Sequence, residues 1–156
     1  SGDLAKIDFA GYVQSLVRYL FDSVSLKPEQ VQLKIQIEDV ALDINTSMPL
    51  GLIINELVAN SFKHAFPGNK KGELQVYLGK SEDDENENEY DYDYTLIVRD
   101  NGIGFPQDLD FRSSDTLGIL LVGTLVKQLH GVIDLERKNG TTFTIKFKKL
   151  RHKAWK

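Results

Sequence analysis

The chain has 156 residues, of which 41% are hydrophobic and 27% charged, and these values are ordinary for one soluble globular domain. It contains no cysteine, which excludes a disulfide framework and any thiolate metal site. The formal net charge is −4, but eight of the 23 acidic residues lie in the segment 81–93, so the rest of the chain is slightly basic. A slightly basic remainder suits a phosphate ligand, but it lacks the charge pattern of a nucleic-acid-binding protein.

The ends of the chain and its hydropathy predict where it acts. No apolar run approaches the length of a transmembrane helix, and no signal peptide is visible. Ser1-Gly2 resembles a cloning remnant, so we expect a piece of a longer protein. We expect residues 1–156 to form one cytoplasmic domain with its core at about 7–148. It should contact neither a membrane nor a nucleic acid, whether its parent is membrane-bound or soluble.

The first predicted elements are a helix and two short strands. Apolar residues recur at helical spacing from Ile7 to Asp22, which predicts an amphipathic helix packed on a core. Residues 31–37 alternate between apolar and polar, which predicts a strand. After a turn, residues 40–44 predict a second strand.

A central helix is predicted from Pro49 to Phe66. Proline suits the first helical position, and Pro67-Gly68 ends the helix. One face of this helix is apolar except for Ser61 and should lie on the core. Its apolar members are Leu50, Ile54, Leu57, Val58, Phe62 and Ala65.

A second face of this helix carries four polar side chains, those of Glu56, Asn60, Lys63 and His64. Two apolar residues lie beside them, so this strip differs from an ordinary wet surface. A carboxylate, an amide, an ammonium and an imidazole in line suggest a site for a ligand with both a metal ion and anionic groups. The alternative is a solvated helix face that is rich in polar residues.

The remaining predicted elements are a strand pair around the acidic segment, a helix and a second strand pair: Glu73–Gly79, Tyr92–Arg99, Leu117–His130, Val132–Glu136 and Thr141–Phe147. Asp115-Thr116 offers an N-cap for the helix, and Gly131 should close it as the C′ residue. Helices that alternate with strand pairs predict an α+β fold. In this fold, helices cover one face of a mixed, mostly antiparallel sheet as a two-layer sandwich.

A glycine-rich segment follows the predicted strand at Asp100-Asn101-Gly102-Ile103-Gly104. Asp-Asn-Gly is also typical of a tight hairpin turn, but no strand follows it here. Gly102 and Gly104 allow the backbone to approach a ligand closely. Asp100, at the end of a buried strand, can accept a hydrogen bond from an exocyclic amine. We therefore interpret this segment as part of a binding site.

Thr116-Leu117-Gly118 opens the helix that follows. A helix N-terminus presents free N–H groups to a phosphate, and Gly118 has no side chain to obstruct it. A simple capped helix start is the alternative. The P-loop, the dinucleotide fingerprint, the protein-kinase catalytic loop and zinc-ligand spacing are all missing from the sequence.

Four segments, in this order, resemble the boxes of the GHKL ATPase superfamily. Residues 55–66 resemble its N box, 100–104 its G1 box, 116–118 a shortened G2 box, and 140–143 its closing G-T-T-F strand. The chain is most similar to the ATP-binding catalytic domain of two-component sensor histidine kinases. Within these it resembles the subfamily with a HisKA_2 dimerisation domain. The resemblance covers about residues 7–147 and implies a Bergerat fold.

The resemblance also implies the ligands and their residues. The domain would bind ATP and Mg²⁺, with Asn60 as the metal ligand. Lys63 and His64 would face the phosphates, and Asp100 would read the adenine amine. The other residues implied to contact the nucleotide are Gly102, Gly104, Leu117, Gly118 and Thr142. The G2 box has one core glycine, so the lid should be short, and Phe111 is the only candidate for a phenylalanine box.

The implied reaction is transfer of the γ-phosphoryl group of ATP to a histidine. Glu56 occupies the position that orients or deprotonates the attacking group. His64, His130 and His152 do not open a helix of the acceptor kind. The acceptor is therefore expected before residue 1 in the parent, in a histidine-bearing dimerisation domain, with relay to the receiver domain of a response regulator. The alternatives are a GHKL regulatory module, such as an anti-sigma-type serine kinase, and a stand-alone GHKL ATPase.

Overall fold

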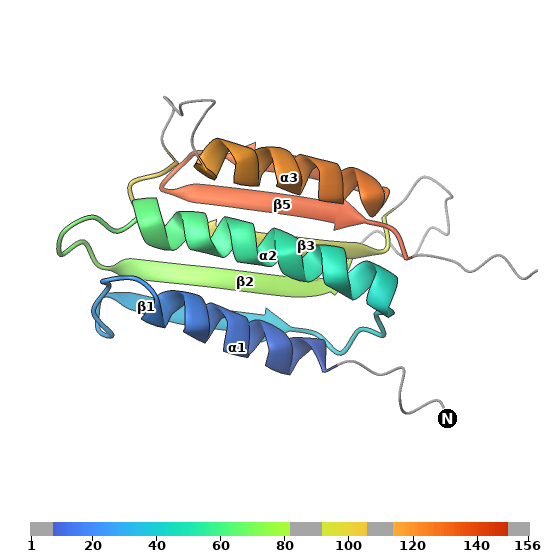
Figure 1. The fold of residues 1–156 in the computed structure, drawn as a ribbon, viewed down its shortest axis with the longest axis horizontal. Helices are drawn as coiled ribbons and strands as arrows, with labels where there is room; N and C mark the ends of the chain where they lie inside the picture. The colour runs from blue at the N-terminus through green and yellow to red at the C-terminus, as the bar shows by residue number, and fades with distance from the viewer. Residues whose placement is uncertain (1–7, 82–91, 106–113, 150–156) are drawn as a thin grey trace, which may run out of the picture.

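The computed structural model describes residues 8–81, 92–105 and 114–149. In chain order the elements are α1 (Phe9–Asp22), β1 (Val31–Ile37), α2 (Ile44–His64), β2 (Gly72–Lys80), β3 (Tyr94–Asp100), α3 (Ser114–Gln128), β4 (Val132–Glu136) and β5 (Thr141–Phe147) (Figure 1).

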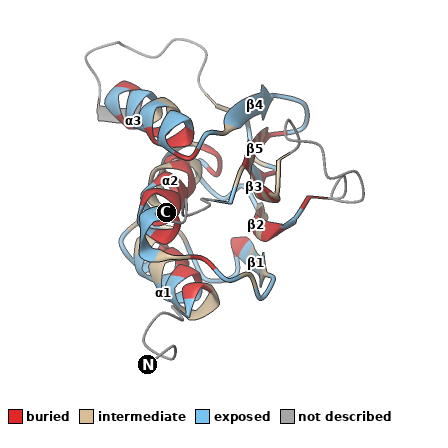
Figure 2. Ribbon diagram, turned by 90° about the vertical axis from the view of Figure 1, so that its right-hand side faces the viewer, coloured by how far each residue is buried: buried red, intermediate tan, exposed pale blue. Residues whose placement is uncertain are grey.

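The strands form one five-stranded sheet in the order β1-β2-β3-β5-β4. The pair β1–β2 is parallel, and the other three pairs are antiparallel. The three helices run along the strands and cover one face of the sheet, with buried residues turned toward the space between the layers (Figure 2). This arrangement confirms the predicted α+β sandwich and its mostly antiparallel sheet.

The core lies between the two layers and is apolar along most of its length. Leu50, Ile54 and Leu57 on α2 are almost fully buried, as are Leu78 on β2 and Leu96 on β3. Full burial of such a side chain stabilises the fold by about 1.5–3 kcal/mol. The apolar face predicted for α2 is therefore correct. Its packing against the sheet fixes the rotation of the helix, and so the directions of its other side chains.

The start of α2 differs from the sequence prediction. The helix begins at Ile44, where the Asp43 carboxylate caps it by accepting a hydrogen bond from the Thr46 N–H at 3.0 Å. The predicted strand at 40–44 is wrong, and so is a helix start at Pro49, which lies inside the helix. A capping carboxylate satisfies an otherwise free N–H, so it marks a helix start more directly than a proline does.

A buried glutamine ties the end of α2 to the start of β1. The Gln30 Nε2 lies within 3.1 Å of the carbonyl oxygens of Phe66, Gly68 and Lys70, to which it donates. These carbonyls belong to the connection between α2 and β2. The first residue of β2, Gly72, pairs with Val31 of the parallel strand β1. The amide thus fixes this connection beside the sheet.

The end of α3 also differs from the prediction by one residue. His130, with φ of 52°, adopts the left-handed conformation, and the Gly131 N–H donates to the Val126 carbonyl in the pattern of a Schellman cap. Gly131 has a different requirement, because a Cβ there would lie 2.5 Å from the Lys146 carbonyl oxygen. The C′ residue is therefore His130, and the helix begins at Ser114 rather than at Leu117.

The predicted hairpin around the acidic segment is confirmed at its base. β2 and β3 pair antiparallel, and the Ser81 N–H donates to the Asp93 carbonyl at 2.9 Å. Most of the acidic segment, the candidate Phe111 and the tail with His152 lie outside the described residues.

Candidate functional site

Several of the predicted site residues gather at one end of the domain. The C-terminal half of α2, the end of β3, the start of α3 and the start of β5 meet at the left of Figure 1. A Cβ on Gly118 would meet the Glu56 carboxylate, and a Cβ on Gly140 would meet the Asp100 carbonyl oxygen. The fold therefore brings together segments that are far apart in the sequence.

Asp100 is a buried carboxylate at the end of β3, with a relative exposure of 3%. Its Oδ2 accepts a hydrogen bond from the Ser61 hydroxyl at 2.7 Å, and its Oδ1 accepts one from the Gly102 N–H at 3.0 Å. Two hydrogen bonds orient the carboxylate and leave acceptor capacity on both oxygens, since an ionised carboxylate has about four acceptor positions. Sequence reasoning noticed Ser61 as the one polar residue on an apolar face but missed this role.

The glycine loop after β3 is fastened to the end of α2 and to the start of β2. The Ile103 N–H donates to the Ala65 carbonyl at 2.9 Å, and the Asn101 side chain accepts from the Glu73 N–H at 2.7 Å. A Cβ on Gly102 would lie 2.2 Å from the Ala65 carbonyl oxygen, so this position requires glycine. Gly104 has a φ of 93°, which also favours glycine.

Thr141 lies opposite Asp100 in the β3–β5 ladder and shares its face of the sheet. The predicted ligand Thr142 pairs with Arg99 instead, and the side chains of successive strand residues point to opposite faces. The structure therefore places Thr142 on the face away from the helices and Thr141 on the Asp100 side. The sequence contained a signal for Thr141. The apolar residues Phe143, Ile145 and Phe147 follow it at every second position, so Thr141 lies on the same buried face of the strand.

Two buried polar atoms of this region lack a hydrogen-bond partner among the described residues. They are the Thr141 Oγ1 and the Asn60 Nδ2, on residues with relative exposures of 4% and 3%. Thr141 pairs with Asp100 in the sheet ladder, and Asn60 directly precedes Ser61, which donates a hydrogen bond to the Asp100 carboxylate. Burying such an atom without a partner costs about 1–3 kcal/mol, so a ligand that satisfies it gains a binding advantage.

Glu56 and Gly118 meet where α2 packs against α3. The Glu56 Oε2 lies 2.5 Å from the position that a Gly118 Cβ would occupy, so the glycine makes room for the carboxylate. Because α3 begins at Ser114, Gly118 lies in its second turn, beyond the free N–H groups of the helix start. The role of Gly118 is thus a steric one, and its neighbour Leu117 is exposed.

Lys63 and His64 lie in the last turn of α2. Cations are favourable there because a helix C-terminus carries a partial negative charge. Lys63 is exposed, whereas His64 is half-buried, with its ring 6.3 Å from the Phe105 ring in an edge-on arrangement. Phe105 in turn contacts Phe143 of β5 edge-on at 6.3 Å. The two phenylalanine rings therefore form an apolar boundary beside the last turn of α2, which carries Lys63 and His64.

The chemistry of the donors limits what this region can bind. Within the described part of the chain, no group of three or more His, Cys, Asp or Glu side chains could hold a metal ion. A metal ion here would need ligand oxygens from another molecule in addition to the amide of Asn60, and Mg²⁺ bound through substrate phosphates has this character. No helix among the described residues combines the length and the apolarity that a membrane span needs.

Comparisons with known proteins identify the family of the chain. Residues 45–151 match the model of the family described as histidine kinase-, DNA gyrase B-, and HSP90-like ATPase. The sensor histidine kinase PdtaS of Mycobacterium tuberculosis is 30% identical over 109 residues, which cover 67% of this chain and 20% of that protein. The blue-light-activated histidine kinase 2 of Erythrobacter litoralis is 26% identical over 115 residues, which cover 74% of this chain and 30% of that protein.

Solved structures show the same fold. The histidine kinase domain of an Erythrobacter litoralis blue-light-activated histidine kinase matches with a TM-score of 0.74 and 21% identity, over 92% of this chain and 66% of that chain. The histidine kinase AdeS of Acinetobacter baumannii matches with a TM-score of 0.64 and 16% identity, over 92% of this chain and 64% of that chain.

The chain spans less than a third of the length of the curated relatives it matches. The family match, in contrast, covers well over half of the chain and includes α2, β3, α3 and β5. The chain therefore belongs to the family of histidine kinase-, DNA gyrase B- and HSP90-like ATPases.

Proposed function

We propose that the chain is the ATP-binding catalytic domain of a sensor histidine kinase. It would transfer the γ-phosphoryl group of Mg²⁺–ATP to a histidine of a dimerisation domain in its parent protein, for relay to a response regulator. Membership of an ATPase family implies ATP binding. The observation that carries the proposal is the buried Asp100 carboxylate, which Ser61 and Gly102 orient. It lies beside the Thr141 hydroxyl, which has no hydrogen-bond partner within the described part of the chain.

Asp100 and Thr141 suit the recognition of adenine. The carboxylate is acceptor-only, so it accepts from the exocyclic amine of adenine and would repel the carbonyl oxygen that guanine has at that position. The Thr141 hydroxyl both donates and accepts, so it can complete the contact directly or through a water molecule. Thr141 thus replaces Thr142 as the residue that we assign to the adenine side.

Asn60 is the residue that would hold Mg²⁺, through its side-chain oxygen, with phosphate oxygens and water in the remaining positions. The bound ion would neutralise charge on the phosphate oxygens. Lys63 and His64 would add positive charge beside the phosphates from the last turn of α2. In phosphoryl transfer, positioning and charge neutralisation account for most of the catalysis.

Glu56 is the residue that we assign to the acceptor. A neutral imidazole has one N–H and one nitrogen lone pair. If the Glu56 carboxylate accepts a hydrogen bond from the N–H, the other nitrogen keeps its lone pair for attack on the γ-phosphorus. Gly118 leaves space for the carboxylate at the α2–α3 contact. A general base of this kind contributes roughly 10²–10⁴ in rate.

The first experiment separates the two roles on α2. Calorimetry with Mg²⁺–ATP should show weaker binding by Asn60→Ala and unchanged binding by Glu56→Gln. Phosphoryl transfer should fall roughly 10²–10⁴-fold in Glu56→Gln. If Glu56→Gln lost affinity as strongly as Asn60→Ala, Glu56 would belong to nucleotide binding instead.

The second experiment identifies the acceptor. The chain is incubated with γ-labelled ATP, alone and together with the histidine-bearing dimerisation domain of its parent. We expect no label on the chain alone, because His64 shares a helix with the metal ligand and His130 lies beyond the far end of α3, which is about 15 Å from Gly118. Acid-labile label should appear on the added domain. Acid-stable label on a serine would indicate a regulatory serine kinase, and release of phosphate without any label would indicate an ATPase.

A further inference from the structure

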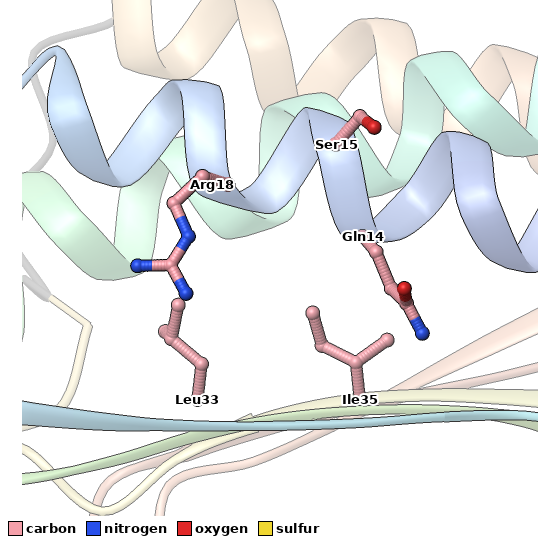
Figure 3. Close-up of a pocket in the computed structure, with 5 residues that line it drawn as sticks. All are labelled: Gln14, Ser15, Arg18, Leu33 and Ile35. Carbon is pink, nitrogen blue, oxygen red and sulfur yellow. The ribbon is translucent and has the colours of Figure 1, made fainter.

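A groove of about 460 Å³ lies between α1 and β1, and none of the proposed ATP-site residues lines it. Gln14, Ser15 and Arg18 line it from α1, and Leu33 and Ile35 line it from β1. Figure 3 shows Leu33 and Ile35 pointing from the strand toward α1, with the Arg18 side chain reaching down to Leu33 and the Gln14 side chain reaching down toward Ile35. The groove therefore has an apolar floor and a polar roof.

The floor strand β1 is an edge strand of the sheet. The Gly72 N–H donates to the Gln30 carbonyl, and the Glu38 N–H donates to the Leu78 carbonyl, so the even-numbered residues turn their backbone groups toward β2. By the alternation of strands, Leu33 and Ile35 turn their N–H and C=O groups to the open edge. Among the described residues, no strand or loop pairs with these groups on that side. Such an edge is a ready template for another strand.

The groove carries one formal charge, that of Arg18. Its guanidinium makes no hydrogen bond or ion pair with the residues that the structure describes, whereas Lys34 on the other face of β1 pairs with Glu73 at 2.9 Å. A guanidinium has five N–H donors and matches a carboxylate. The groove thus offers a positive charge beside an apolar floor, and both lie along an edge with free backbone groups.

We propose that β1 binds an extended, acidic segment of a partner protein, which adds to the sheet as a sixth strand. Strands in a sheet lie about 4.8 Å apart, and alternate side chains of the added strand point to the helix side, where the groove has room. Apolar side chains would lie beside Ile35, and one carboxylate would pair with Arg18. Backbone pairing gives affinity in this mode of recognition, and the alternate side chains give specificity.

The probe is the acetylated and amidated heptapeptide Thr-Val-Thr-Glu-Thr-Val-Thr, in which the valines and the glutamate share one face. Its controls are the same peptide with glutamine for glutamate and a version with N-methyl groups on alternate amides. On the protein, Arg18→Gln removes the charge, and Arg99→Gln is the matched control, because Arg99 is exposed on β3 outside the groove. Binding is followed by NMR titration and amide hydrogen exchange of the full chain.

We expect peptide binding to slow amide exchange at Leu33 and Ile35 but not at Gln32 and Lys34, whose amides face β2. Arg18→Gln and the glutamine peptide should each weaken binding about fivefold, without a further loss in combination. Arg99→Gln should have no effect, and the N-methylated peptide should not bind. Arg18→Glu should recover binding with lysine in place of the peptide glutamate. The proposal is overturned if the peptide does not bind at millimolar concentration, if exchange at Leu33 and Ile35 is unchanged, or if the shifts centre on the α1–α2 surface around Met48.

Discussion

The two ends of α2 serve different purposes, although both are buried against the same sheet. Around Leu50 and Ile54 the helix is part of the buried hydrophobic core. Around Asn60 and Ser61 it contacts a buried carboxylate, and two buried polar atoms nearby have no partner among the described residues. The first region stabilises the fold. In the proposed site, the second region leaves buried hydrogen-bonding groups available to a polar ligand at a cost in stability.

The largest effect should come from breaking the apolar region. Leu78→Ala on β2 removes a fully buried side chain opposite Leu96 and should lower the free energy of unfolding by about 2–5 kcal/mol. At a temperature where the variant remains folded, its affinity for ATP should equal that of the wild type. Denaturant unfolding measures the loss of stability, and calorimetry measures the affinity for ATP. A loss of affinity in the folded variant would show that the two regions are coupled.

The next effect should come from the polar region itself. Asp100→Asn keeps the shape of the side chain but replaces one acceptor oxygen by a donor. ATP affinity should fall about tenfold to a hundredfold, or about 1–3 kcal/mol. Asp134→Asn, at an exposed carboxylate on β4, is the control and should bind ATP normally. In the wild type, equal affinity for ATP and GTP would contradict the assignment of Asp100 to adenine.

A third change should move stability and binding in opposite directions. Thr141→Val removes a hydroxyl that has no partner among the residues the structure describes, with little change in the volume of the side chain. We expect about 1–2 kcal/mol of added stability in the absence of ligand, together with weaker ATP binding. Thr142→Val, on the other face of β5, should leave ATP affinity unchanged. If Thr142→Val weakened binding and Thr141→Val did not, the original assignment of Thr142 would stand.

The smallest effect should come from the two glycines of α3. Gly123→Ala meets nothing within 4 Å and should stabilise the helix by about 0.5–1 kcal/mol without affecting phosphoryl transfer. Gly118→Ala should stabilise the helix by a similar amount, because only the flexible end of Glu56 must move. That movement should slow transfer while sparing ATP affinity. Unfolding curves and single-turnover assays of the two variants provide the comparison, and equal transfer rates would separate Gly118 from the chemistry.

The sequence allowed the layers of the fold to be predicted, for a physical reason, and it also supplied candidate site residues that remain predictions. Apolar periodicity reports which face of an element is buried, and the loop at Asp100 and Gly102 is defined by neighbours in the chain. The contact between Glu56 and Gly118 depends on how two helices pack, which a local pattern does not contain. Pro49 misled the prediction, because a proline tolerated inside a helix looks the same in sequence as one at its start. Residues 40–44 alternate like a strand, but the Asp43 cap begins a helix among them.

The parallel pairing of β1 with β2 also has a consequence for the order of folding. Val31 pairs with Gly72 across the whole length of α2, whereas Glu136 and Thr142 pair across a short turn. Closing a long loop costs more entropy, so contacts at large sequence separation tend to form late. The β4–β5 hairpin should therefore be present in the transition state, and β1 should join the sheet afterwards, when Gln30 can reach the carbonyls beyond α2. Substitutions in β1 should then accelerate unfolding and leave the folding rate almost unchanged.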